Sequence, residues 1–425
     1  MMHNEETTEP VTLEAILSKE NLTAAWLAVK ANDGAAGVDG LSIEQTRKHL
    51  QEHWGQIKAK LLQGEYKPAA VRAVEIPKAN GGKRTLGIPN VQDRLIQQAI
   101  HQKLAPLWEA EFSPHSYGFR PNRSAHDAVG AAQRFVKEGK TWVVDVDLKG
   151  FFDEVNHDIL MRHVGQRVRD KMLLRLIGGY LRAPMQDKDR RNTKRYKGTP
   201  QGGPLSPLLA NIYLDPLDKE LEKRGVSFVR YADDIAIFAS SERSAARILE
   251  SVVSWIEKHL KVPVNREKSK SGPTDKSALL GFRIYSDGRV GVSPRAIERM
   301  KAQVRTLWNA RQNKTSEELR EQWQRYTRGW WNYFKLADWR REVTNTSSWI
   351  RRHIRKCFWQ RWKTPRGRLN ALKRLGVRGR ALGMMYTRRG AWRVAKHVVL
   401  NQALNNKTLR RYGFSPPWDF AEAAR

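Results

Sequence analysis

Two short acid-bearing stretches decide the fold, and they read WVVDVDL (142–148) and FVRYADDIAIF (228–238). The first is typical of a buried strand, because its other residues are apolar and mostly β-branched. The pattern of the other stretch predicts two short strands that meet at an acidic tip. Carboxylates within buried strands are costly unless something compensates their charge. The pattern therefore predicts a central β-sheet on which acids from separate strands converge.

A divalent cation is the natural compensation for these carboxylates. Asp147, Asp233 and Asp234 offer hard oxygen ligands, which suit Mg²⁺. Two-metal phosphoryl transfer needs carboxylates from separate strands at one point, where one ion activates the attacking hydroxyl and the other steadies the leaving group. By period two, Asp145 points the same way as Asp147, so the pattern leaves the choice between them open. The structural alternative for Asp233 and Asp234 is an exposed acidic turn.

Helices and one hairpin are expected around these strands. AVRAVEIPK and KRTLGIP flank Asn80-Gly81-Gly82, which predicts a β-hairpin. Apolar periodicity predicts helices at 13–30, 42–63, about 93–108, 206–221 and 242–260, and a strand pair near 279–292. Pro216 should kink or end the regular part of its helix. Long basic helices at 295–312, 317–337 and 345–363 follow without convincing strands, so a mixed α/β catalytic part precedes an all-helical basic part.

The charge balance indicates an anionic partner. The 425 residues include 77 Lys and Arg against 44 Asp and Glu, a net charge of +33 that would destabilise a compact protein by self-repulsion. Nucleic acid and anionic membrane both qualify, but the longest apolar runs are far below the roughly 20 residues of a membrane span. The acidic N-terminus lacks the apolar stretch of a signal peptide, and it does not resemble a transit peptide. The single cysteine, Cys357, excludes a disulfide framework or a Cys-rich zinc module. A cytoplasmic nucleic-acid binder is the expected class.

The basic charge is concentrated near the C-terminus. Residues 293–425 carry 32 Lys and Arg against 8 Asp and Glu, together with ten of the fifteen Trp. Backbone neutralisation plus aromatic surfaces is what a groove for RNA or single-stranded DNA requires. The alternative is a solvated helical face with the Trp side chains in a core. For the region as a whole we expect nucleic-acid contact.

The motifs resemble, in the expected order, those of the reverse transcriptases encoded by group II introns, which also act as maturases. VDLKGFFDEVNHDIL (146–160) and RYADD (230–234) resemble the two metal motifs, and KGTPQGGPLSPLLANIYL (197–214) the loop and helix that pack on the nascent base pair. IPKANGGKRTLGIP (77–89) resembles the fingers hairpin, SYGFRPNRSAHDAV (116–129) a further family stretch, and RYTRGWWNYFK (325–335) the helical thumb. Residues 13–45 resemble the N-terminal segment that separates these enzymes from retroviral ones.

The resemblance implies an α+β right-hand polymerase, with fingers and an antiparallel palm sheet, followed by an all-helical thumb and a basic C-terminal segment. The implied domains are fingers and palm with the N-terminal extension (1–292), the thumb or maturase domain (293–364) and a basic DNA-binding segment (365–425). The fold of that last segment does not follow from the sequence. Many relatives end in a Cys/His metal-dependent endonuclease. This chain has neither its cysteines nor its length, so we expect a compact form that uses another source of DNA nicks or primers.

Roles for individual residues follow from the same resemblance. The metal ligands would be Asp147, Asp233, Asp234 and the backbone of Leu148, and the dNTP contacts Lys78, Arg84, Phe152, Gln201 and Lys268. Phe152 would lie under the incoming sugar and exclude a 2′-hydroxyl, whereas its alternative is a core aromatic. Lys268 would be a general acid for pyrophosphate release, and its alternative is a surface lysine. Further nucleic-acid contacts would be Arg120, Arg328, Trp330 and Trp331, with Arg120 equally interpretable as a structural clamp.

The implied activity is RNA-directed DNA synthesis with two Mg²⁺ ions (Mn²⁺ being the alternative), dNTPs, an RNA template and a DNA primer. Binding of the group II intron RNA would assist splicing, and contact with target DNA would serve retrohoming in a bacterial cytoplasm or nucleoid. One alternative is a host-recruited relative in phage defence or DNA repair. Another is a splicing-only RNA-binding protein, against which the intact acids argue. A membrane-surface protein is disfavoured, because the basic charge accompanies a coherent metal site.

Overall fold

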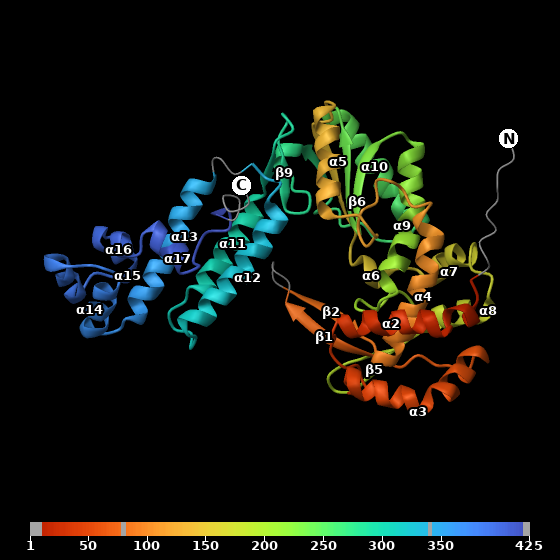
Figure 1. The fold of residues 1–425 in the computed structure, drawn as a ribbon. Coiled ribbons are helices and arrows are strands. Elements are labelled where there is room, and N and C mark those ends of the chain that lie inside the picture. The colour runs from red at the N-terminus through yellow and green to blue at the C-terminus, as the bar shows by residue number, and fades with distance from the viewer. Residues whose placement is uncertain (1–10, 78–81, 339–341, 420–425) are drawn as a thin grey trace. The chain divides into compact units, whose positions relative to one another are not determined.

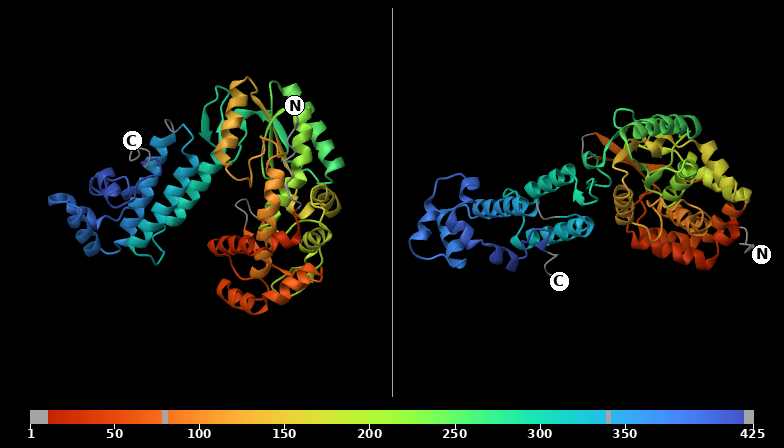
Figure 2. Two further views of the ribbon diagram at one scale, coloured as in Figure 1. Left: turned by 45° about the vertical axis from the view of Figure 1, so that its right-hand side comes forward. Right: turned by 90° about the horizontal axis from the view of Figure 1, so that it is seen from above.

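The computed structural model describes residues 11–77, 82–338 and 342–419 (Figure 1). Contacts divide the chain into two compact units, Met1–Pro273 and Thr274–Arg425, and Figure 2 gives two further views of them. The strand pair near 279–292, which the sequence places with the fingers and palm, belongs by its contacts to the second unit. Phe282 explains this, because its ring lies 5.5 Å from Tyr333 and 5.1 Å from Phe334, both on a helix of that unit. A division at 364/365 stays a prediction.

The N-terminal helices of the first unit pack against one long helix. They are α1 (Leu13–Ile16), α2 (Lys19–Ala31) and α3 (Ile43–Leu62), and the long helix is α4 (Val91–Glu109). The helix predicted at 13–30 is interrupted because the Ser18 side chain caps α2 by accepting a bond from the Asn21 amide. Asn21 then fixes the break by donating to the carbonyls of Ile16 at 2.8 Å and Ala99 at 3.0 Å.

The predicted hairpin forms one edge of a four-stranded sheet. β1 (Val71–Pro77) pairs antiparallel with β2 (Lys83–Ile88), and the pairing runs from Arg72 opposite Ile88 to Pro77 opposite Lys83. β1 also pairs in parallel with the short β4 (Met185–Gln186), which is followed by β5 (Asn192–Thr193). Strands of two residues carry too little pattern to be predicted, so the sequence shows the hairpin and not the sheet that it joins.

The central sheet is antiparallel, as predicted, and carries both acidic stretches. Its strands are β3 (Trp142–Asp147), β6 (Ser227–Tyr231), β7 (Asp234–Ala239) and β8 (Lys270–Pro273), in the order β6-β7-β3-β8. Helices α5 (Ala125–Lys137), α9 (Ser206–Lys223) and α10 (Glu242–His259) pack on it (Figure 1). This α+β arrangement confirms the predicted fold class.

Of the two predicted effects of Pro216, a kink or the end of the helix, the second does not occur, because α9 runs through this residue. Proline removes one backbone hydrogen bond and strains the preceding turn. Burial offsets that loss, because Leu208, Leu214 and Leu221 along the helix are at most 5% exposed. The remaining helices of this unit are α6 (Phe151–Glu154), α7 (His157–Gly165) and α8 (Lys171–Arg182). Helix α7 packs on α9 and α8, α8 packs on α3, and Phe151 of α6 contacts the Tyr213 ring of α9.

Within residues 274–338 and 342–419, the second unit is helical apart from one small hairpin. β9 (Phe282–Ile284) and β10 (Val290–Val292) precede α11 (Pro294–Leu307), α12 (Ser316–Phe334) and α13 (Glu342–Arg361). The C-terminal segment folds into short helices: α14 (Pro365–Arg374), the 3₁₀ helix η2 (Gly379–Tyr386), α15 (Ala391–Val394), α16 (Val398–Ala403) and α17 (Asn406–Arg411). No helix in the described ranges is long and apolar enough to cross a membrane.

Tryptophan forms the core of this unit. Trp308 and Trp323 are each 1% exposed and Trp359 is 2% exposed. The Trp308 ring meets those of Trp323 at 5.4 Å and Phe414 at 5.3 Å, both edge-on. These three tryptophans are core residues, so they are not part of the nucleic-acid surface that the sequence predicts for this region.

Asp93 should make the folded protein less stable as the pH rises from about 4 to about 6. Its carboxylate is 2% exposed and accepts hydrogen bonds from the Tyr66 hydroxyl at 2.7 Å and the Ala69 amide at 3.2 Å. Burial raises its pKa from 3.8 to about 6. The unfolded chain therefore releases this proton first, and the free energy of unfolding falls across that window by on the order of 3 kcal/mol.

Urea unfolding of the wild type and of Asp93→Asn between pH 4 and pH 7 measures this contribution. The stability of the wild type relative to the variant should decline with rising pH and level off above about pH 6. A difference that stays constant with pH would contradict the prediction.

Candidate active site

The two acidic strands place Asp147 directly opposite Asp234. In the β3–β7 pair these residues are Cα partners, and Asp145 faces Ala236 two positions away. Val144 and Val146 alternate with the acids on β3 and are 0% and 3% exposed. One face of β3 therefore packs into the core, while the acids share the other face. Like charges directly opposite each other destabilise a strand pair, so this arrangement calls for a cation.

Asp233 lies in the tight turn that joins β6 to β7. Ala232, beside it, has a φ of +56°, which alanine rarely adopts. Gly118 packs against this turn so closely that a Cβ atom on it would lie 2.2 Å from the Ala232 nitrogen. The SYGFR stretch and the YADD turn are thus in direct backbone contact.

A buried ion pair supports the acidic turn. Arg230 and Asp218 are both 0% exposed, and the guanidinium Nε donates to Asp218 Oδ1 at 2.7 Å. Nη1 of Arg230 also donates to the carbonyl of Ala232 at 3.1 Å and to Asn211 Oδ1 at 2.9 Å. Asn211 in turn donates to the carbonyl of Gly118 at 2.9 Å. This network joins helix α9, the SYGFR stretch and the acidic turn.

The carboxyl groups at the turn hold protons more tightly than ordinary acids. Water reaches Asp234 on its open side, but the protein around the rest of the carboxyl removes hydration and raises its pKa to about 6. The negative charges of Asp233, Asp147 and Asp145 raise the pKa of Asp234 further. Burial also raises the pKa of Asp233, as does the charge of Asp147, while Arg84 opposes the shift.

This donor set fits a divalent cation in its chemistry. The carboxylates are hard oxygen ligands on two adjacent strands, and their mutual repulsion is what a cation would relieve. In the part of the chain that the structure describes, no three His, Cys, Asp or Glu side chains already converge into a ligand cluster.

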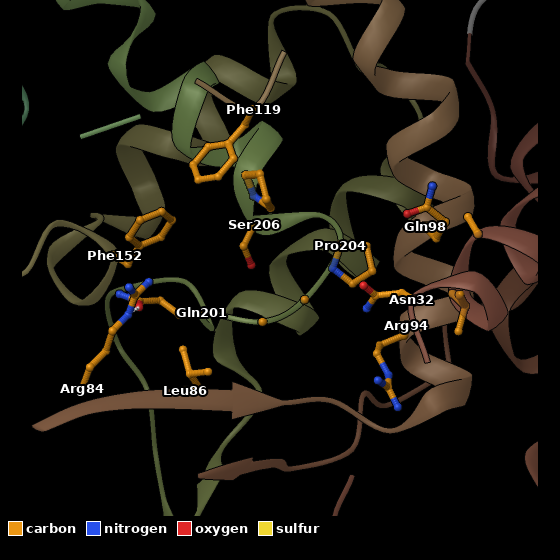
Figure 3. Close-up of a pocket in the computed structure, with 15 residues that line it drawn as sticks. Asn32, Arg84, Leu86, Arg94, Gln98, Phe119, Phe152, Gln201, Pro204 and Ser206 are labelled. Atoms are coloured by element: carbon orange, nitrogen blue, oxygen red, sulfur yellow. Dashed lines mark hydrogen bonds between the residues drawn. The ribbon is translucent and has the colours of Figure 1, made fainter. Parts of the chain in front are cut away.

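A cavity of about 570 Å³ in the same unit brings together three of the residues predicted to hold the nucleotide (Figure 3). Arg84 and Gln201 line it, and Nε of Arg84 donates to Oε1 of Gln201. Phe152, only 9% exposed, lines it from helix α6. Gly202 has a φ of +134°, and a Cβ on it would lie 2.5 Å from the carbonyl oxygen of Gly87. Strand β2 and the QGG loop can therefore approach closely enough to form one wall.

Known proteins match the chain in both units. The family model "Reverse transcriptase (RNA-dependent DNA polymerase)" matches residues 76–284. A second family model, "Group II intron, maturase-specific domain", matches residues 297–376. Protein YkfC of Escherichia coli (strain K12) is 32% identical over 313 residues, which cover 64% of this chain and 82% of that protein. The chain belongs to the reverse transcriptases that carry the maturase-specific domain of group II introns.

Other relatives are matched over a smaller part of their length. The group II intron-encoded protein LtrA of Lactococcus lactis subsp. cremoris is 37% identical over 235 residues, which are 55% of this chain and 36% of that protein. The chain thus spans about a third of that relative. Among solved structures, a telomerase from Candida albicans in complex with a fragment of telomeric RNA is similar over 80% of this chain and 70% of that chain. The sequence identity there is 13% and the TM-score 0.42.

Two further residues named for this reverse transcriptase site lie near Asp147. Nζ of Lys268 is 3.8 Å from Oδ2 of Asp147, and the side chain of Lys268 is 59% exposed. Leu148 follows Asp147 and forms a bridge with Val264, so its backbone lies next to the acids. Lys78 lies outside the described residues.

The predicted nucleic-acid contacts differ in exposure. Arg120 is 8% exposed and donates to the carbonyls of Ser113 and Ser116 and to the Glu109 carboxylate, which favours the structural clamp. Trp330 is 8% exposed and its ring lies tilted against that of Phe334 at 4.7 Å, so it belongs to the core of the second unit. Arg328 is exposed and Trp331 half-buried on the same helix, α12.

Sequence reasoning missed the residues that support the acidic turn. The signal for Arg230 was present, because an arginine inside the apolar run FVRYADD must find a buried partner. Asp218 and Asn211 carry no such signal, since acids and amides are common on helix surfaces. Only the packing of α9 against β6 identifies them as its partners.

Proposed function

We propose that this protein copies RNA into DNA at Asp147, Asp233 and Asp234, and that its basic second unit binds the intron RNA to assist splicing and retrohoming. The observation that carries the proposal is the opposition of Asp147 and Asp234, with Asp233 in the adjoining turn. The charge of Arg84, a residue of the neighbouring cavity, influences the Asp233 carboxyl. Family membership supports the reaction class.

Two Mg²⁺ ions, with Mn²⁺ as the alternative, would activate the primer 3′-hydroxyl and stabilise the leaving pyrophosphate. Asp147, Asp233 and Asp234 would hold them, together with the backbone of Leu148. Each acid must be ionised to do so, and at neutral pH Asp234 is ionised because its pKa is about 6.

The cavity residues would position the nucleotide. Arg84 carries a fixed positive charge and would bind the triphosphate by charge-assisted hydrogen bonds, with Lys78 as its partner from the same hairpin. Gln201 orients the Arg84 guanidinium through their hydrogen bond. Lys268, near Asp147, would supply a proton to the departing pyrophosphate.

Phe152→Ala should let the polymerase accept ribonucleotides more readily. The Phe152 ring lines the cavity from a buried position against Phe151, 5.3 Å away, so it would present a rigid wall to the 2′ position of the sugar. We expect the preference for dNTPs over rNTPs to fall by about tenfold to a hundredfold, the usual value of one buried steric or apolar contact. The measurement is kcat/KM for dATP and ATP on one primer–template. Unchanged selectivity would mean that Phe152 is a core residue without a role in selecting the sugar.

RNA binding should weaken steeply with salt. The exposed basic residues of the second unit would neutralise phosphates and release counterions, so the logarithm of the association constant should fall linearly with that of salt concentration. Six to ten phosphate contacts would lose roughly 10³ to 10⁵ in affinity between 50 and 200 mM salt. Filter binding of a structured intron RNA over this range measures the slope, and a flat response would contradict a phosphate-dominated interface.

Primer extension on an RNA template with Mg²⁺ and dNTPs tests the polymerase directly. DNA synthesis by the wild type supports the proposal. Tight RNA binding without extension in either Mg²⁺ or Mn²⁺ would instead indicate a protein that acts on RNA structure alone.

A further inference from the structure

Phe119, in the SYGFR stretch, combines strain and exposure in a way that its packing does not explain. Its φ is +60°, and it is the only aromatic residue with a positive φ among those that the structure describes. For a bulky side chain this backbone conformation is a genuine outlier, which persists only where the surroundings impose it. The residue is nevertheless 49% exposed, so burial of the ring does not offset the strain.

Hydrogen bonds fix the residues on both sides of Phe119, and those before it are held by the supports of the acidic turn. Gly118 accepts a hydrogen bond from Asn211 at 2.9 Å, and the amide of Tyr117 donates to the carbonyl of Arg230 at 2.8 Å. On the other side, the buried Arg120 holds the carbonyls of Ser113 at 2.6 Å and Ser116 at 3.0 Å. The backbone at position 119 therefore has little freedom to relax, and the ring is held where it stands.

Phe119 lies in the wall of the cavity that would hold the nucleotide. Phe119 lines the same cavity as Arg84, Phe152 and Gln201, and Figure 3 shows both Phe rings directed into it. Exposed aromatic rings are the usual platforms for nucleobases, because every base has a flat apolar face. A nucleotide whose triphosphate lies at Arg84 and whose sugar meets Phe152 would set its base within reach of Phe119.

We propose that Phe119 is a nucleotide-contact residue, whose ring packs on the base of the incoming deoxynucleoside triphosphate. The inference rests on the proposed polymerase function. It assigns the base of the nucleotide to a residue that is not among the nucleotide contacts predicted from the sequence. The strain at position 119 holds the ring in the cavity before the nucleotide arrives, so less ordering is needed on binding.

The test separates the ring from the strain. Phe119→Asn and Phe119→Gly both relieve the positive φ, since Asn and Gly tolerate it, and both remove the ring. Phe119→Tyr keeps the ring and the strain. Tyr196→Ala removes an exposed aromatic of the same unit, 80% exposed, that is not part of the cavity wall.

We expect Phe119→Asn and Phe119→Gly to raise KM for dNTPs about tenfold, the loss of one stacking contact, without lowering the melting temperature. Phe119→Tyr and Tyr196→Ala should stay within about twofold of the wild type, well under one such contact. A residue with only a structural role would show the reverse, a lower melting temperature and an unchanged KM.

The outcomes are distinct. Normal KM for dNTPs in folded Phe119→Asn overturns the inference, and so does a rise confined to KM for the primer–template. If the wild type itself does not extend a primer, the proposed function fails instead. Binding of a non-hydrolysable dNTP to the wild type and the variants, measured by calorimetry with a bound primer–template, would then still report on the contact.

Discussion

Replacing Asp233 by alanine should abolish DNA synthesis and leave RNA binding nearly intact. Asp233 sits in the turn between β6 and β7, next to the opposed pair Asp147 and Asp234. Losing a single electrostatic contact to the transition state costs about 10²–10³ in kcat, and a lost metal ligand should cost at least that much. The protein carries a net charge of +33, so one carboxylate fewer scarcely changes its attraction for RNA.

Primer extension and filter binding on the same preparations decide this prediction. Asp189→Ala is the matched control, because Asp189 is an exposed acid of the same unit outside the cavity wall. Asp145→Ala belongs in the same series, since Asp145 shares a face of β3 with Asp147 and contributes to the raised pKa of Asp234. Equal loss of synthesis and of RNA binding in Asp233→Ala would contradict the separation of the two roles.

Breaking the Arg230–Asp218 pair should cost the protein about 3–5 kcal/mol of unfolding free energy, because a buried charge is left without its partner. Both residues are 0% exposed. Arg230→Met leaves the Asp218 carboxylate alone, and it also removes the hydrogen bond to the Ala232 carbonyl that holds the acidic turn. DNA synthesis should therefore fall together with stability.

The double variant Arg230→Met/Asp218→Leu distinguishes the two effects. Removing both charges leaves no buried unpaired ion, so it should be more stable than Arg230→Met alone. Synthesis should stay low, because neither new side chain can donate to Ala232 or to Asn211. Arg266→Met, which breaks the exposed pair with Glu257, is the control and should cost at most about 1 kcal/mol. A similarly small loss for Arg230→Met would refute the proposed support.

The sequence alone determined the elements whose signals are local. Alternating apolar and polar residues on either side of Asn80-Gly81-Gly82, and two short apolar runs that meet at the YADD tip, predicted two hairpins, and both form. A period of two is a property of each strand by itself, so it needs no knowledge of the neighbours. The order of the motifs was sufficient for the family, which the matches over residues 76–284 and 297–376 bear out.

Only the tertiary structure decided which residues meet. Pattern put Asp145 and Asp147 on one face of β3, and the register with β7 then set Asp147 against Asp234. Tryptophans that could have served a nucleic-acid surface became the core of the second unit. Helix α9 continued past Pro216 because packing outweighed a local penalty.

Sequence reasoning missed some residues because their roles, too, depend on tertiary contacts. Asp218 lies on helix α9 and Phe119 in a loop, and no local rule connects either with the acidic turn. Their roles depend on contacts between segments far apart in the chain, such as the hydrogen bond from Asn211 to Gly118. Such contacts form only when the whole sheet and its helices have packed, because burial selects the partners of a charge and local propensity does not.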